Sequence, residues 1–332
     1  MSRLKLTYAG EDHFDRTKAL QTGQVSPPGI DLNYIALGVR ELFRRQAQFA
    51  EFESSEMSVS TMAMLVSRGI DTFVGVPVFP SRHFRHRQIY VNVDSGIEKP
   101  EDLKGKKVGV PEYQMTAALW QRAMLQHDYG VHPEDIHWFY GGLNTADYAE
   151  RMRHDVPDGV RLESIPTDRT LNELLEAGEL DAISASQSPY AYRKGSPKIR
   201  RLWENYRPVE TDYFERTGFY PIMHMVAVRR DVYEANRWVP VSLLQGFVES
   251  RRLGWEQMHD ADVPPITHPW WHEELKQIER IFGGDPQIYG FENNRKILEA
   301  MMQYSFEQGL SKRLVAPEEL FAPETLGVAV PR

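Results

Sequence analysis

The sequence contains no cysteine, so disulfide bonds, thiolate metal ligands and a cysteine nucleophile are all excluded. It lacks an apolar run of about 20 residues, the length that a membrane-spanning helix requires. A phosphate-binding loop is missing too, because Gly141-Gly142 is not followed by a lysine. Basic residues are in the minority, with 39 Lys and Arg against 47 Asp and Glu and a formal net charge of −8. We therefore expect neither a nucleic-acid partner nor a membrane partner.

The N-terminus lacks the pattern of an export signal, which is a charged stub, an apolar run and a small-residue cleavage site. Instead, Leu4, Leu6 and Tyr8 alternate with Lys5 and Thr7, a pattern that predicts a strand. We therefore expect a cytoplasmic protein.

The 332 residues are 41% apolar and 26% charged, as is typical of a soluble globular protein. Apolar runs and helical spacing alternate along the chain, which predicts an α/β protein with helices on the faces of its sheets. Strands are predicted at 4–8, 29–37, 56–59, 73–78, 89–93, 106–110, 161–165, 182–185 and 223–228. Helices are predicted at 15–22, 41–49, 62–68, 116–126, 171–177, 241–258, 272–281 and 295–308.

The length allows two domains of ordinary size. We expect a discontinuous first lobe, residues 1–87 with 225–332, and a second lobe, residues 88–224. Two chain crossings would then form a hinge between the lobes. In sheets of this kind a ligand binds beyond the carboxyl ends of the strands.

Five segments of the chain stand out together: DRT (15–17), GIDLNY (29–34), FPSRHFRH (79–86), GVPEYQMTA (109–117) and TGFYPIMH (217–224). In this order they resemble the 4,5-dihydroxyphthalate decarboxylase family. The resemblance runs from about residue 4 to about residue 247, and the three long segments are specific in combination. The opening GEDHFDR, at the first expected cleft loop, is longer than the GDYDR pattern of the family.

The resemblance implies a two-lobed, type II periplasmic-binding-protein-like fold that is used for catalysis. It also implies a carboxy-lyase of aromatic catabolism, which converts 4,5-dihydroxyphthalate to protocatechuate and carbon dioxide without oxidation. Such a reaction needs a base near the phenol, a proton donor near the departing carboxylate and a cation for the carboxylate that stays. Arginine suits the last role because its two-pronged geometry matches a carboxylate. An activated phenol needs no electron sink, so we expect no cofactor.

The segment 81–87 should lie at the mouth of the cleft, because it follows a buried strand. Its arginines and histidines predict an anion site in this acidic protein. Arg82 and His86 are the first choices, since alternate positions of an extended stretch face the same side, and Arg85 is added. A solvated basic loop or hinge salt bridges are the alternative.

The segment 112–116 precedes a predicted helix, whose free N–H groups suit a carboxylate. Tyr113 is expected to stack on or donate to the ring, and Gln114 and Thr116 to bind oxygens. Glu112 would repel an anion unless it acts as a base or metal ligand. Helix capping is the simpler alternative for Glu112 and Thr116.

His224 lies in an apolar strand at the second crossing, where a satisfied core histidine is the alternative to a functional one. With His86 it would form a pair that divides acid and base roles. The same pair with Glu112 would instead hold a divalent metal, although no HExxH spacing supports a metal.

Combining these arguments, we expect a small aromatic carboxylate as the substrate. His86 and His224 would transfer protons, Arg82 with Arg16 would hold the retained carboxylate, and Ser60 would bind a carboxylate oxygen. Two rivals stay open: a solute-binding protein for an aromatic carboxylate, and a decarboxylase of a related phenolic acid. The long C-terminal helices also suggest a homo-oligomer.

Overall fold

The computed structural model describes residues 3–146, 156–260, 262–263 and 265–331. The chain forms two compact units. The first comprises Met1–Arg82, Ile222–Met302 and Val315–Arg332, and the second comprises His83–Pro221 and Gln303–Leu314. The predicted lobes, in contrast, place residues 303–314 with the first lobe.

The first unit is built on a five-stranded sheet with the order β2-β1-β3-β11-β4. β1 is parallel to β2 and β3, whereas β11 runs antiparallel between β3 and β4. β3 and β4 are buried along their whole length. β3 lies inside the sheet, whereas β4 is its edge strand, where Gly75 forms a bridge with Phe321. The strands are β1 (Leu4–Gly10), β2 (Ile30–Ala36), β3 (Ser54–Ser58), β4 (Phe73–Val76) and β11 (His224–Arg229).

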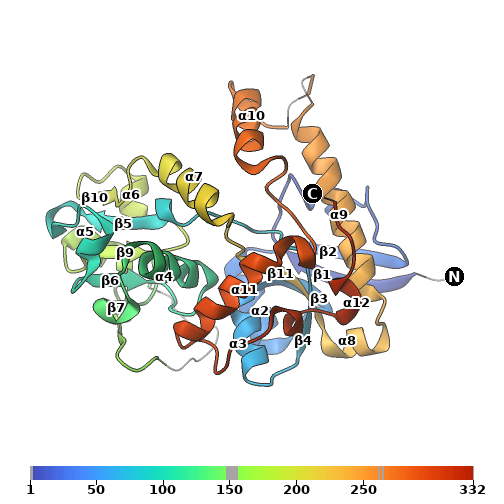
Figure 1. Cartoon of the computed structure of the whole chain (residues 1–332), viewed down its shortest axis with the longest axis horizontal. Helices are drawn as coiled ribbons and strands as arrows, with labels where there is room; N and C mark the ends of the chain where they lie inside the picture. Colours follow the sequence, from blue (N-terminus) through green and yellow to red (C-terminus); the bar gives the residue numbers. More distant parts are fainter. Residues whose placement is uncertain (1–2, 147–155, 261, 264, 332) are drawn as a thin grey trace. The chain divides into compact units, whose positions relative to one another are not determined.

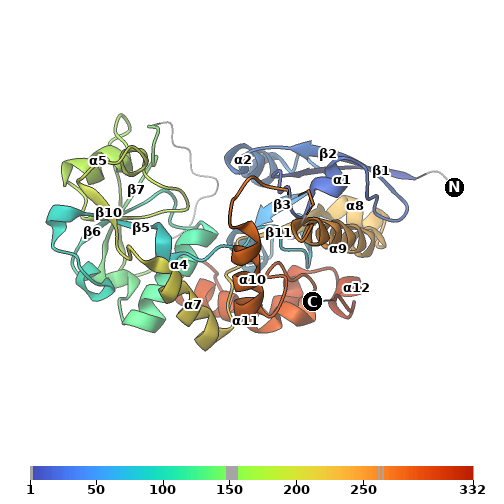
Figure 2. The ribbon, with the colours of Figure 1, turned by 90° about the horizontal axis from the view of Figure 1, so that it is seen from above.

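Helices pack beside this sheet in both views of the ribbon (Figure 1, Figure 2). α2 presents Leu42 and Phe43 to a cluster with Ala9 and Phe52, because apolar residues recur on one of its faces. The helices of this unit are α1 (Lys18–Gln21), α2 (Val39–Phe49), α3 (Val59–Ser67), α8 (Arg230–Ala235), α9 (Val239–Met258), α10 (Trp271–Phe282), α12 (Pro323–Leu326), the 3-10 turn η5 (Pro317–Leu320) and most of α11 (Phe291–Glu307).

The second unit is built on a six-stranded sheet with the order β10-β5-β9-β6-β7-β8. β6 is parallel to β7 and β9, whereas β5 is antiparallel to β9 and β10. The strands are β5 (Ile89–Asn92), β6 (Lys107–Val110), β7 (His137–Tyr140), β8 (Arg161–Ser164), β9 (Ala182–Ser184) and β10 (Ile199–Arg201). The helices are α4 (Thr116–Tyr129), α5 (Leu171–Ala177), α6 (Tyr190–Arg193) and α7 (Tyr206–Thr217), with 3-10 turns η1 (His86–Gln88), η2 (Val93–Ser95), η3 (Pro100–Leu103) and η4 (Pro133–Asp135).

Residues 303–314 belong to the second unit because polar and aromatic contacts tie them to α4. The buried Arg122 donates from Nε to Gln308 Oε1 at 2.8 Å, and Gln308 Nε2 donates to the Leu119 carbonyl at 3.0 Å. Trp120 also packs edge-on against Tyr304.

The predicted α/β class is confirmed, and each predicted strand or helix corresponds to an element of the structure. The sequence patterns did not predict β7, β10, α6, α7, α8 or α12. In the described part of the chain, no helix is both long and apolar enough to cross a membrane.

Candidate active site

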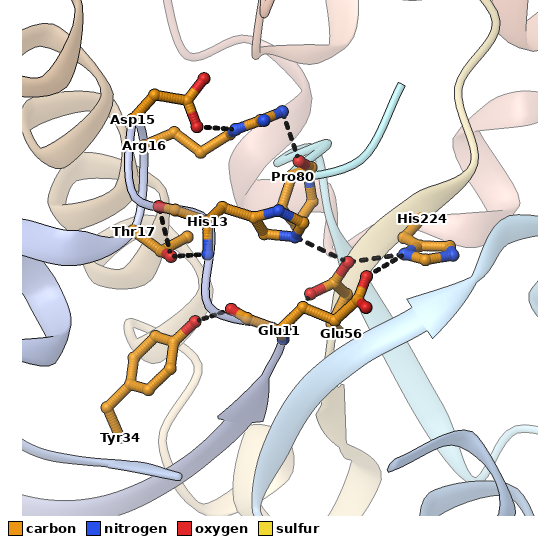
Figure 3. Close-up of polar contacts among 9 residues, drawn as sticks. All are labelled: Glu11, His13, Asp15, Arg16, Thr17, Tyr34, Glu56, Pro80 and His224. Atoms are coloured by element: carbon orange, nitrogen blue, oxygen red, sulfur yellow. Dashed lines mark hydrogen bonds and ion pairs between the residues drawn. The ribbon is translucent and has the colours of Figure 1, made fainter. Parts of the chain in front are cut away.

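Three segments of the first unit meet at the edge of its sheet where β1 and β3 end. They are the loop 11–17 that follows β1, the strand β3 itself, and the first residue of β11, His224. Parallel strands end at one edge, and the antiparallel β11 begins there, with His224 opposite Ser58. Figure 3 shows the polar side chains that these segments bring together.

The centre of this cluster is Glu56, whose side chain has no solvent exposure. His224 Nδ1 lies 2.6 Å from Glu56 Oε1, and His13 Nε2 lies 3.3 Å from the same oxygen (Figure 3). The backbone N–H of Glu11 donates to Glu56 Oε2 at 3.0 Å. A carboxylate can only accept, so both imidazoles donate to it, and their other ring nitrogens are left to act elsewhere.

These contacts set the protonation of the cluster. Burial alone opposes ionisation of Glu56, but the charges and hydrogen bonds of His13 and His224 hold the pKa of its carboxyl well below the usual value. Burial alone would lower the pKa of His13, but the charge and hydrogen bond of Glu56 raise it. Burial and the neighbouring Glu56 carboxylate raise the pKa of Glu11. The site therefore favours a buried anion beside a protonated His13.

The loop 11–17 is held in place by its own side chains and by its neighbours. Thr17 Oγ1 accepts from the His13 N–H at 3.1 Å and donates to the His13 carbonyl at 3.0 Å. Arg16 donates from NH1 to the Pro80 carbonyl and from Nε to Asp15, both at 2.8 Å. α9 touches the loop at Gly254, where a Cβ would lie 1.7 Å from the Asp15 carbonyl oxygen. Only glycine permits this approach.

Glu11, Glu56 and His224 could also hold a metal ion, because each offers one donor atom and these atoms lie within 4.8 Å of one another. Carboxylate and imidazole are ordinary ligands of divalent metals. The 2.6 Å separation of His224 Nδ1 and Glu56 Oε1, however, is the length of a strong hydrogen bond. An ion at this position would have to replace the proton that the two groups share.

Four of the predicted site residues lie in the first unit: Arg16, Ser60, Arg82 and His224. His224 and Arg16 belong to the cluster described above, and Ser60 is buried in the first turn of α3. Arg82 is also buried, and its NH2 group donates to Asn294 and to the Ile288 carbonyl.

The other six predicted residues lie in the second unit: Arg85, His86, Glu112, Tyr113, Gln114 and Thr116. His86 is 2% exposed and packs edge-on against the rings of Trp203 and Tyr213, both 5.2 Å away. Burial, then the charge of Arg216, lowers the pKa of His86 to about 4. Burial, aided by Arg87, lowers the pKa of the buried Arg85 to about 9.

Arg82 and His86 were predicted to face the same side because the stretch between them was expected to be extended. The stretch is not extended throughout, because Arg85 has helical dihedral angles and His86 begins the turn η1. Near α4, Tyr113, Gln114 and Thr116 are buried, Glu112 is half-buried, and Thr116 is the first helical residue. The Tyr113 ring lies under the Arg122 guanidinium at 3.7 Å, which places it in a packed structural contact.

Sequence reasoning missed Glu11, His13 and Glu56. His13 and its neighbours were recognised as a cleft loop but were not included among the site residues. The available signal for Glu56 was a lone acidic residue within a short strand of serines and methionine, SSEMS. Such a charge is rarely buried without a partner, and its partner His224 lies 168 residues further on.

The chain is similar in sequence to known proteins over nearly its whole length. The family model described as "NMT1/THI5 like" matches residues 83–156. A 4,5-dihydroxyphthalate decarboxylase of Comamonas testosteroni is 35% identical over 326 residues, which cover 98% of this chain and 98% of that protein. A 4,5-dihydroxyphthalate decarboxylase of Pseudomonas putida is 34% identical over 219 residues, which cover 66% of this chain and 84% of that protein.

Solved structures confirm the predicted type II periplasmic-binding-protein-like fold. The periplasmic aliphatic sulphonate binding protein of Escherichia coli matches with a TM-score of 0.57 and 14% identity, over 98% of this chain and 99% of that one. The alkanesulfonate-binding protein of Xanthomonas axonopodis pv. citri matches with a TM-score of 0.57 and 12% identity, over 97% and 99%. The desulfurization enzyme DSZB matches with a TM-score of 0.51 and 16% identity, over 98% of each chain. At these identities the likeness establishes the fold alone.

Proposed function

Because the chain belongs to the 4,5-dihydroxyphthalate decarboxylase family, we propose that it is a carboxy-lyase that converts 4,5-dihydroxyphthalate to protocatechuate and carbon dioxide in phthalate catabolism. One observation carries this proposal, namely the 35% identity that spans 98% of both chains. A relationship of this extent includes the loop 11–17, β3 and β11, so it covers every segment of the cluster around Glu56.

The cluster supplies the acid that this reaction needs. A buried carboxylate fixes the orientation of an imidazole and stabilises its protonated form, as in other carboxylate–histidine pairs of enzymes. Glu56 holds His224 through Nδ1 at 2.6 Å, which leaves Nε2 to act on the substrate. We assign His224 as the donor of the proton that replaces the departing carboxylate, with His13 as the second cation of the site.

The retained carboxylate needs a cation that stays charged. Arg16 is held at the same edge by Asp15 and by the Pro80 carbonyl, and an arginine binds a carboxylate well. We therefore assign Arg16 to the retained carboxylate. The roles predicted for Arg82, Arg85, His86 and the segment 112–116 stay predictions, as does the absence of a cofactor.

A direct turnover assay tests the proposal. The protein is treated with a chelator, dialysed and mixed with 4,5-dihydroxyphthalate, while carbon dioxide and protocatechuate are both followed. We expect turnover to survive chelation and to fall by about 10²- to 10⁴-fold in His224→Ala, the range typical of a lost proton donor.

His137→Ala is the matched control, because His137 also pairs with a glutamate, Glu163 at 2.8 Å, but at an exposed position of the second unit. The control should keep the activity of the wild type. Tight binding of 4,5-dihydroxyphthalate without any product would refute the proposal and favour a solute-binding protein.

A further inference from the structure

Both backbone polar groups of Glu11 form hydrogen bonds with side chains of the sheet. Its N–H donates to Glu56 Oε2 at 3.0 Å, and its carbonyl accepts from the Tyr34 hydroxyl at 2.5 Å. These two partners come from β3 and β2, so both peptide groups of Glu11 are fixed by the sheet. The main chain of Glu11 is consequently held in place before any ligand arrives, which reduces the entropy lost on binding.

The carboxyl of Glu11 lies on the open side of the cluster. Its Oε2 atom is 3.9 Å from His224 Nδ1, and its side chain is 30% exposed, whereas that of Glu56 is fully buried (Figure 3). No described residue donates a hydrogen bond to the carboxyl oxygens of Glu11. Of the two carboxyl groups next to His224 Nδ1, those of Glu11 and Glu56, only that of Glu11 is exposed.

We propose that Glu11 is the base that accepts the proton of the substrate hydroxyl para to the departing carboxylate. This inference rests on the function proposed above. A phenolic O–H needs an acceptor, and the two imidazoles are assigned above as the proton donor and the second cation of the site, so neither is left for that role. The anionic carboxylates of the substrate, in turn, fit beside the cations and away from Glu11.

The surroundings of Glu11 support a base. The charged and titratable groups around it are Glu56 from β3, His224 from β11, His13 and Arg16 from its own loop, and Tyr8 from β1. Burial and Glu56 raise the pKa of Glu11, while His224, His13 and Arg16 oppose that rise. A carboxylate whose pKa is raised is a stronger base for a phenol than an ordinary one.

The step balances in atoms and charge. The hydroxyl O–H bond breaks, its proton passes to a Glu11 carboxylate oxygen, and its electron pair moves into the ring. The ring carbon that carries the departing carboxylate takes a proton from the His224 imidazolium. The carbon–carbon bond then breaks, its electron pair restores the aromatic ring, and carbon dioxide leaves. Glu11 returns its proton to the phenolate oxygen, and water reprotonates His224, so that one proton is consumed in each turnover.

Binding of the product reports this proton transfer without turnover. Protocatechuate is titrated into the protein, and the absorbance difference between the phenolate and the phenol is recorded as a function of pH. The wild type should show the phenolate of bound protocatechuate at a lower pH than free protocatechuate does. Glu11→Gln should bind protocatechuate equally well or better, because a negative charge is removed, but without the phenolate signal.

The substitution Glu11→Gln should also affect kcat and KM differently. We expect kcat for Glu11→Gln to fall by about 10²- to 10⁴-fold while KM is unchanged or lower, and Glu11→Asp to recover part of the loss. A purely structural role would instead raise KM. Asp12→Asn is the matched control, since Asp12 is the next residue, is 52% exposed and is placed in no role here.

The outcomes separate this inference from the proposed function. Full turnover or an intact phenolate signal in Glu11→Gln would overturn the role of Glu11 and leave the decarboxylase standing. A phenolate signal that disappears on chelation and returns with Mn²⁺ would make Glu11 a metal ligand, and would also overturn its role as a base. Absence of turnover in the wild type would instead refute the proposed function itself.

Discussion

The two units place histidines in opposite surroundings. In the first unit, His13 and His224 both lie against the Glu56 carboxylate. In the second unit, His86 lies between the rings of Trp203 and Tyr213, and no described residue bonds its Nδ1 atom. The same side chain therefore meets an anion in one place and an apolar enclosure in the other.

The difference shows how the environment decides what a histidine can do. Glu56 raises the pKa of His13, whereas burial lowers the pKa of His86 to about 4. The first unit thus favours the protonated form of His13, whereas the second holds His86 neutral near pH 7. Burial alone does not mark a catalytic histidine, because the partner of the ring must also be known.

Removing the negative charge of Glu56 should have the largest effect on decarboxylation. Glu56→Gln keeps the shape of the side chain but removes the charge that holds His224 and His13. We expect decarboxylation to fall by about 10²- to 10⁴-fold, as for loss of a proton-transfer group, with little change in secondary structure. Product formation and circular dichroism measure the two effects.

Glu53→Gln is the control for this substitution. Glu53 also accepts from a backbone N–H, that of Thr7 at 2.9 Å, and an amide oxygen can still accept that bond. The control should retain activity. If Glu56→Gln were as active as this control, the cluster would not be the acid of the reaction.

Strands and helices could be predicted from the sequence because their signals are local. Alternation in residues 4–8 predicted β1, and helical spacing in residues 41–49 predicted α2. These two inferences need only a window of a few residues. His224 became a functional candidate in another way, from its place at the expected second chain crossing.

The partner of His224 could not be predicted in this way. Glu56 comes near His224 only because β11 inserts antiparallel between β3 and β4, and this pairing joins segments far apart in the chain. The choice of His86 had a similar origin, because a basic segment looks alike whether its histidine faces a ligand or two aromatic rings. Charge composition is read from the sequence, but the enclosure of a side chain is not.

A substitution of His86 in the second unit should have a smaller effect on activity. His86→Leu replaces a neutral, enclosed imidazole by an apolar group of similar size. Replacing a buried polar atom that lacks a partner is nearly neutral or stabilising, so the fold should persist. We expect kcat/KM to change by less than about tenfold, well below the effect of a lost proton donor. A larger loss with an intact fold would support His86 as a proton-transfer residue, as the sequence patterns predict.

The smallest effect concerns stability as a function of pH, measured as the difference in Tm between the wild type and Glu56→Gln. The pKa of Glu56 is lowered in the folded protein, so its stabilisation is present above the unfolded value of about 4.3 and is lost as the pH falls. The pKa of His13 is raised, so its stabilisation is present below the unfolded value of about 6.5 and is lost as the pH rises through the folded value. The difference in Tm between the wild type and Glu56→Gln should therefore be largest between about pH 4.3 and about pH 6.5. His13→Gln should remove most of the alkaline decline and keep the acid one, whereas a difference that does not vary with pH would mean that charge does not hold the cluster together.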